Sequence, residues 1–333
     1  MAMTGFHGLD YLSFEENLPF SEQCKLLEEA LINHPEDELV IIRHLLPINH
    51  ICKNPPERTL ELADKLILLS NDDYDVETSL FHRALVLFEH HKNYDEAEAL
   101  FFKVLEIEPE HSGVFDRLID LYREKDELEK ALQIAARMSK FKRLKYYGLM
   151  QRGQILLEIG RLDESVSDFQ MVVADGTYAL HAHEGLGKCY LMMRNYQAAM
   201  EQFLKAHEIC HYPETLYPYG VGLCYQHLND PYRAMKWYTI ALAINPLMPE
   251  ALNNMAALHH ELNNGWEEAV PFLLNAAKLS NEAINRKMQP VYRNLWAYYT
   301  NILDHDKAEY YKRLNMKCTG LDDDAIDFFE SFD

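Results

Sequence analysis

The stretch Leu180–Cys210, LHAHEGLGKCYLMMRNYQAAMEQFLKAHEIC, is matched in outline by Thr215–Pro246, TLYPYGVGLCYQHLNDPYRAMKWYTIALAINP. Each copy has a glycine, a tyrosine three residues later, a short polar break, and then two alanines that flank an aromatic ring. These residues are Gly187, Tyr190, Ala199, Phe203 and Ala206 in the first copy, and Gly222, Tyr225, Ala234, Tyr238 and Ala241 in the second. Spacings of three and four put them on one face of each of two helices. The stretch therefore predicts a helix pair that packs closely at its small residues, with rings filling the space beside them.

The small residue of the second helix recurs along most of the chain. It falls at Ala63, Ala97, Ala131, Ser165, Ala199, Ala234, Ala269 and Ala308, with four steps of 34 residues, two of 35 and one of 39. A helix–turn–helix unit of this length resembles the tetratricopeptide repeat. The resemblance implies an all-α fold, an α-solenoid of about eight antiparallel helix pairs in a right-handed superhelix. It implies little about function, because such repeats serve many unrelated partners.

The repeat pattern divides the chain into four predicted regions. Residues 1–75 are degenerate helical repeats, 76–280 a regular array, 281–318 an atypical terminal repeat, and 319–333 an acidic, aromatic tail. In the first region we expect a helix over Glu36–Leu46 that Pro47 stops. The tail, LDDDAIDFFESFD, is either a helix that caps the last repeat or a peptide that docks on a partner or in the protein's own groove.

The charge balance limits the classes of partner. The chain has 53 acidic and 32 basic residues, a net charge of −21. Because nucleic-acid binding needs a basic patch, we expect no nucleic-acid partner. A cationic or amphipathic protein segment fits better, although an acidic surface can also be merely solvated.

Cysteine usage and hydropathy bear on the compartment. None of the six cysteines forms a CxxC pair, and Cys189 and Cys224 occupy equivalent positions two residues after the repeat glycines. We interpret them as reduced packing residues of a cytoplasmic protein. The N-terminal sequence lacks the basic start and apolar core of a cleaved signal peptide, and no apolar run is long enough for membrane insertion.

The resemblance also implies which side chains line the concave surface. In the central repeats the inward positions on the first helices hold Tyr147, Met150, Gln154, His181, Glu184, Lys188, Leu216, Tyr219 and Leu223. Towards the two ends they hold Gly113, Asp116, Asp120, Glu250, Asn253 and Ala257. An apolar and aromatic centre with acidic flanks predicts a groove for an apolar, partly basic peptide or helix. The alternative is that these side chains pack against adjacent helices.

Other chemistry is not expected. One version of the family grips a terminal carboxylate with two asparagines and basic residues, which the inward positions here do not provide. His207, Cys210 and His211 have the spacing of metal ligands on one helical face, but their helix ends there and no fourth ligand is nearby. Phosphate-loop, nucleophile-elbow and dinucleotide motifs are absent, so we predict no catalytic residue, metal or cofactor.

The sequence thus predicts a non-enzymatic scaffold or chaperone-like adaptor that binds a peptide or helix of a partner. One alternative is a secretion-associated chaperone or secreted effector, and another is an enzyme or regulator that uses the repeats to recruit its substrate. The identity of the partner and the oligomeric state stay open.

Overall fold

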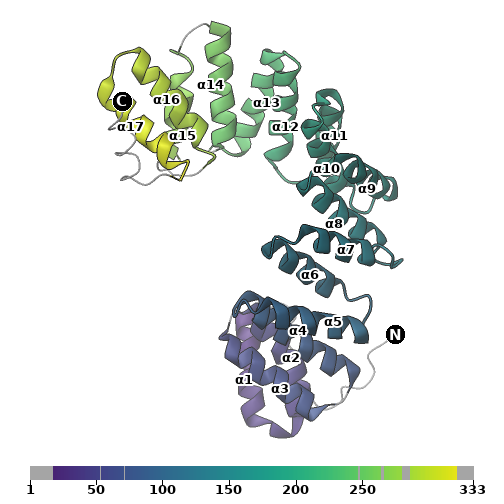
Figure 1. The fold of residues 1–333 in the computed structure, drawn as a ribbon. Coiled ribbons are helices and arrows are strands. Elements are labelled where there is room, and N and C mark those ends of the chain that lie inside the picture. The colour runs from purple at the N-terminus through teal and green to yellow at the C-terminus, as the bar shows by residue number, and fades with distance from the viewer. Residues whose placement is uncertain are drawn as a thin grey trace. The chain divides into compact units, whose positions relative to one another are not determined.

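The computed structural model describes residues 18–52, 54–70, 72–246, 248–263, 266–279 and 286–320. Over these residues the chain forms 17 α-helices and one short 3₁₀ helix, and no strand (Figure 1). The predicted all-α solenoid is confirmed. The chain divides into two compact units, Met1–Ile155 and Leu156–Asp333.

The first unit is a series of helices in which each packs on the next along the chain from α1 to α7. Its helices are α1 (Phe20–Asn33), η2 (Pro35–Asp37), α2 (Glu38–Ile51), α3 (Pro56–Leu69), α4 (Asp73–Glu89), α5 (Tyr94–Ile107), α6 (Ser112–Glu124), α7 (Leu128–Met138) and α8 (Lys145–Glu158), whose last turn belongs to the second unit. Alternate helices also touch, α2 with α4 and α4 with α6, as stacked helix pairs require.

The second unit repeats this arrangement. Its helices are α9 (Leu162–Asp175), α10 (Ala179–Met192), α11 (Tyr196–Ile209), α12 (Leu216–His227), α13 (Pro231–Ile244), α14 (Pro249–Asn263), α15 (Val270–Leu279), α16 (Gln289–Asn301) and α17 (His305–Lys317). Each packs on its successor, and the first helices of neighbouring pairs meet where α10 contacts α12 and α14 contacts α16.

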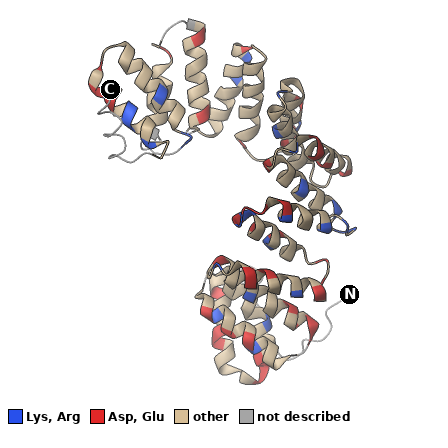
Figure 2. Ribbon diagram, viewed as in Figure 1, with Lys and Arg blue, Asp and Glu red and all other residues tan. Residues whose placement is uncertain are grey.

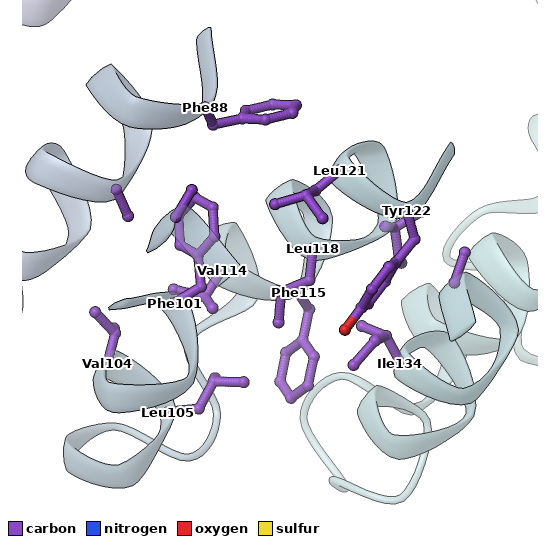
Figure 3. Close-up of a cluster of buried hydrophobic side chains, with 14 of the residues drawn as sticks. Phe88, Phe101, Val104, Leu105, Val114, Phe115, Leu118, Leu121, Tyr122 and Ile134 are labelled. Carbon is purple, nitrogen blue, oxygen red and sulfur yellow. The ribbon is translucent and has the colours of Figure 1, made fainter. Parts of the chain in front are cut away.

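The core of each unit lies between the helix pairs. In the first unit, α4 to α7 enclose Phe101 and Phe115, whose side chains are fully buried among aliphatic residues (Figure 3). The eight small residues of the predicted register are all at most 9% exposed: Ala63, Ala97, Ala131, Ser165, Ala199, Ala234, Ala269 and Ala308. The small residues that recur in the sequence are therefore the ones that are buried between the helices.

The repeat glycines are required by ring contacts. A Cβ at Gly187 would lie 2.7 Å from Phe203 Cε1, and one at Gly222 would lie 2.7 Å from Tyr238 Cδ1. Gly220, which the sequence pattern did not single out, makes a similar contact from the other side, with a Cβ position 2.8 Å from Phe203 Cδ2. The Phe203 ring therefore sits between two glycines, one on α10 and one on α12.

The two helices of a pair are joined by a turn of constant design. One residue with positive φ ends the first helix in six described turns: Lys92, Asp126, Gly160, Arg194, Asn229 and Leu303. At Arg194 the turn is a Schellman motif, because the Asn195 N–H bonds to Tyr190 O at 2.8 Å and the Arg194 N–H to Leu191 O at 2.9 Å. Asn195 then caps the next helix by accepting from the Ala198 N–H at 3.3 Å.

One predicted boundary is wrong. The helix expected to stop at Pro47 continues as α2 to Ile51, with Pro47 inside it. The proline removes one N–H from the ladder, but the last turn is fixed by buried Asn49, which donates to Thr59 Oγ1 at 2.9 Å. The expectations for residues 1–17 and for the tail after Gly320 lie outside the described residues.

Candidate peptide-binding surface

In the first unit, Tyr147 contacts Asp116, which was also predicted to lie at an inward position. The half-buried Tyr147 hydroxyl on α8 donates to Asp116 Oδ1 on α6 at 2.9 Å, and Gln151 donates to the Tyr147 oxygen at 3.1 Å. Burial raises the pKa of Asp116, and the hydrogen bond from Tyr147 only partly opposes this. This side of the first unit is therefore a polar contact between first helices.

Met150 does not belong to an open groove. It is only 7% exposed, so its side chain is unavailable to a partner. The prediction of an exposed methionine at this position is wrong, because the register fixes the direction of a side chain but not how much neighbouring side chains cover it. Gln154, one turn further along α8, is half-buried.

In the second unit, the acidic residues at the inward positions already have partners. Glu184 forms an ion pair with Lys188 at 2.5 Å and accepts a hydrogen bond from the Tyr217 hydroxyl at 3.3 Å. Glu250 lies 3.4 Å from Lys287 Nζ. Between them, α12 contains no Asp, Glu, Lys or Arg (Figure 2). The centre of this surface is uncharged, and the acids beside it are paired with lysines. Of the predicted inward residues in this unit, His181 and Ala257 are exposed and the others are half-buried.

The predicted residues on α12 serve partly as core. Tyr219 packs beside Tyr238 with ring centroids 5.7 Å apart, and its hydroxyl lies 3.4 Å from Asn254 Nδ2. Burial raises the pKa of Tyr219 to about 12, with a smaller contribution from Glu250. Leu216 packs against the cluster around Phe203. Asn253 on α14 accepts from Asn294 at 2.9 Å. These half-buried side chains thus pack in part against neighbouring helices, and their role in a groove stays a prediction.

A hollow of about 580 Å³ opens where α10 and α12 end. We call it the turn-edge hollow, and it is lined by Leu191, Met192, Arg194, Tyr196, Leu223 and His227. Met192 is 57% exposed, and the Tyr196 and His227 rings stack with centroids 4.3 Å apart. Of the predicted residues, only Leu223 belongs to it. The others were missed because they lie at the helix ends and the turn, outside the inward offsets.

Two side-chain clusters among the described residues have metal-ligand chemistry, His34 with Glu36 and Asp37, and Glu77 with Glu108 and His111, and the second has an arrangement that disfavours a metal. Ligand atoms of Glu77, Glu108 and His111 lie within 4.8 Å of one another. His111 Nδ1 accepts the Val114 N–H at 3.1 Å, so the proton sits on Nε2, which faces Glu77 Oε1 at 3.0 Å. A metal on Nε2 would need the opposite tautomer and would break the contact to Val114.

Two of the three residues considered as ligands, His207 and Cys210, have other contacts. The His207 ring packs edge-on to Trp237 at 5.8 Å, and Cys210 Sγ donates to Tyr212 O at 3.2 Å. All six cysteines are free, and Cys189 and Cys224 are fully buried, as packing residues should be. Among the described residues, no helix has both the length and the apolar character that crossing a bilayer requires.

Comparisons with known proteins agree with the fold. Residues 150–211 match the tetratricopeptide repeat family. A curated relative, "Photosystem I assembly protein Ycf3" from Synechococcus elongatus, is 43% identical over 51 residues, which is 15% of this chain and 30% of the relative. The chain spans less than half the length of this and of the Cyanophora paradoxa and Sorghum bicolor proteins of the same name.

Two solved structures have the same fold. The C-terminal part of a TPR repeat-containing protein from Cytophaga hutchinsonii matches with a TM-score of 0.52 and 19% identity, over 74% of this chain and 98% of that one. The pilF protein of Pseudomonas aeruginosa matches with a TM-score of 0.52 and 16% identity, over 65% of this chain and 96% of that one.

Proposed function

Because the chain is a tetratricopeptide-repeat protein, we propose that it is a non-enzymatic adaptor or assembly factor that binds a segment of a partner protein. The name of the Ycf3 relatives supports a role in assembly, through a short shared region. The free, buried cysteines are typical of a cytoplasmic protein, and we place the adaptor there.

The observation that carries the proposal is the turn-edge hollow. A recess that combines Leu191, Met192 and Leu223 with the polar groups of Arg194, Tyr196 and His227 suits an interface anchor, since its exposed methionine can adapt its shape to different partners. The partner segment would continue from there over the first helices of the second unit, past His181, Glu184, Lys188, Leu216, Tyr219, Leu223 and Asn253.

The ion pairs decide which partner chemistry is favoured. Glu184 and Glu250 are each satisfied by a lysine, so a strongly basic segment would have to compete with existing pairs. Exposed ion pairs contribute about 0.2–1 kcal/mol each, which leaves little to gain from replacing them. We therefore favour an amphipathic segment that places an apolar side chain in the turn-edge hollow and polar groups over the paired acids.

The proposal is tested with peptides selected from a random display library against the whole chain. A selected peptide is then titrated by fluorescence anisotropy against the wild type and against Met192→Glu. We expect at least a tenfold loss of affinity, about 1.4 kcal/mol, because a charge at the rim cannot be buried beside an apolar anchor.

The matched control is Met171→Glu on α9, where the replaced methionine is 43% exposed. It should bind as the wild type does, and both variants should keep the wild-type melting temperature. Equal affinity of Met192→Glu and the wild type for every selected peptide would remove the turn-edge hollow from the function.

A further inference from the structure

A second hollow lies in the second unit, where the second helices α13 and α15 meet the first helix α14. It has a volume of about 480 Å³ and mostly apolar walls from α13, α14 and α15, and we call it the second-helix hollow. Its lining residues are Thr239, Leu242, Ala243, Pro246, Leu252, Met255, Phe272 and Asn275. None of them belongs to the turn-edge hollow, so this surface is independent of the proposed peptide site.

The preceding repeat contains bulkier side chains at the corresponding place. Trp237 lies 35 residues before Phe272, and His207 lies 35 residues before Leu242. The rings of Trp237 on α13 and His207 on α11 are in contact, with centroids 5.8 Å apart. Phe272 instead stacks on His259 of α14, with centroids 5.0 Å apart. The junction one repeat earlier therefore has two rings in contact where this junction has the hollow, and here the Phe272 ring packs on α14 instead.

Two lysines flank the hollow. Lys236 lies one turn before Thr239 on α13, and Lys278 one turn after Asn275 on α15, so each shares a helix face with a lining residue. Both are exposed, and neither forms an ion pair with a described residue. An apolar recess between two lysines fits a ligand that combines apolar side chains with negative charge.

The chain itself contains a segment of this kind. Residues 321–333 hold six acidic and no basic residues, together with Ile326, Phe328, Phe329 and Phe332. We propose that this C-terminal segment binds in the second-helix hollow of its own chain, with aromatic side chains in the recess and carboxylates toward Lys236 and Lys278.

The connectivity allows this contact. Helices that pack in succession alternate in direction, so α13, α15 and α17 run parallel, and Gly320 after α17 lies at the same end of the unit as Pro246 after α13. Neighbouring helix axes are about 8–10 Å apart, which puts the hollow about 20 Å from the end of α17. Thirteen residues span up to about 43 Å when extended, so the segment reaches with length to spare.

The test uses a labelled synthetic peptide of residues 321–333 and fluorescence anisotropy. The peptide should bind a chain that ends at Gly320, and should bind the full-length chain at least tenfold more weakly, because the attached segment competes. Binding should weaken as salt is raised, and a peptide with Phe328→Ala and Phe329→Ala should bind at least tenfold more weakly than the original.

Blocking variants of the shortened chain locate the site. Ala243→Trp fills the hollow from an exposed position and should abolish binding, whereas Glu208→Trp, at the equivalent exposed position one repeat earlier, should not. Lys236→Glu combined with Lys278→Glu should weaken binding at least tenfold, with exposed Lys205→Glu as its control. Circular dichroism checks that each variant is folded.

Four outcomes would overturn the proposal. The peptide could fail to bind the shortened chain, or bind Ala243→Trp and Glu208→Trp equally well. It could also bind the full-length and shortened chains alike, which would mean that a foreign segment rather than the chain's own fills the hollow. A full-length dimer that becomes a monomer on shortening would place the segment on a second copy instead.

Discussion

At the scale of single residues, the contact between a glycine and a ring determines how closely the helices of a repeat approach. The Phe203 ring faces Gly187 within its own helix pair and Gly220 on the next first helix. A single ring thus sets two helix–helix distances: between α10 and α11 within a repeat, and between α11 and α12 of neighbouring repeats. A side chain added at either glycine must displace a fully packed aromatic group rather than the tip of a flexible chain.

Gly187→Ala should lower the free energy of unfolding by about 1–3 kcal/mol through overpacking, because its Cβ would lie 2.7 Å from Phe203. Urea denaturation followed by circular dichroism measures the loss. The double variant with Phe203→Leu should lose less than the sum of the two single variants, since the smaller side chain leaves room for the added methyl group. Strict additivity would contradict the contact.

Buried His82 gives the first unit a predictable response to acid. Burial lowers the pKa of His82 from 6.5 to about 4, while its ring bonds to Thr78 O at 2.8 Å and faces His50, Glu77 and His111. Between these pH values the unfolded chain binds a proton that the native chain does not. This histidine's contribution is therefore complete above pH 6.5 and is lost as the pH falls towards 4.

The lowered pKa of His82 in the folded chain corresponds to a decrease of about 3 kcal/mol in the free energy of unfolding between pH 7 and pH 4. Urea denaturation of the wild type and of His82→Asn at several pH values measures it, and the variant should lose less stability on acidification. Exposed His91→Asn is the control and should follow the wild type. Parallel pH profiles for wild type and His82→Asn would refute the assignment.

At the scale of helices, four described turns within a pair both end one helix and cap the next with a side chain, that of Asn93, Asn195, Asp230 or Asp304. Asp230 illustrates this: its N–H bonds to Tyr225 O at 2.9 Å, and its carboxylate accepts from the Arg233 N–H at 3.1 Å. Asp230→Ala should cost about 1 kcal/mol, the usual value of an N-cap. Asp230→Asn should cost much less because an amide oxygen keeps the cap. Thermal denaturation of both variants tests this, and equal losses would assign the effect to the charge instead.

The sequence predicted some elements better than others for physical reasons. The small residues from Ala63 to Ala308 were found because a buried contact recurs at a nearly fixed spacing. The end of α2 was missed because a hydrogen bond distant in sequence, between Asn49 and Thr59, outweighs the local effect of Pro47. Burial of Met150 and the position of the turn-edge hollow depend on side-chain volumes in neighbouring repeats, which spacing alone does not encode.

At the scale of the whole molecule, a solenoid transmits a disturbance only through neighbouring repeats. Gly222→Ala, with a Cβ position 2.7 Å from Tyr238, should therefore weaken its own repeat most. Hydrogen exchange should become faster in α11 to α13 and stay unchanged in α2 to α5 of the first unit. Uniformly faster exchange along the chain would instead mean that the molecule opens as one cooperative body.

The constant turn has a consequence for how such a chain can change in length during evolution. In the six described turns the residue with positive φ stands five positions before the buried small residue, as Lys92 does before Ala97 and Leu303 before Ala308, although the repeats themselves differ in length. One residue inserted between Arg194 and Asn195 would rotate the next helix by about 100° and expose its packing face. Additions are thus confined to connections that follow second helices, such as the exposed segment around Tyr212. Those connections are where a new loop, tag or domain can be added without disturbing the array.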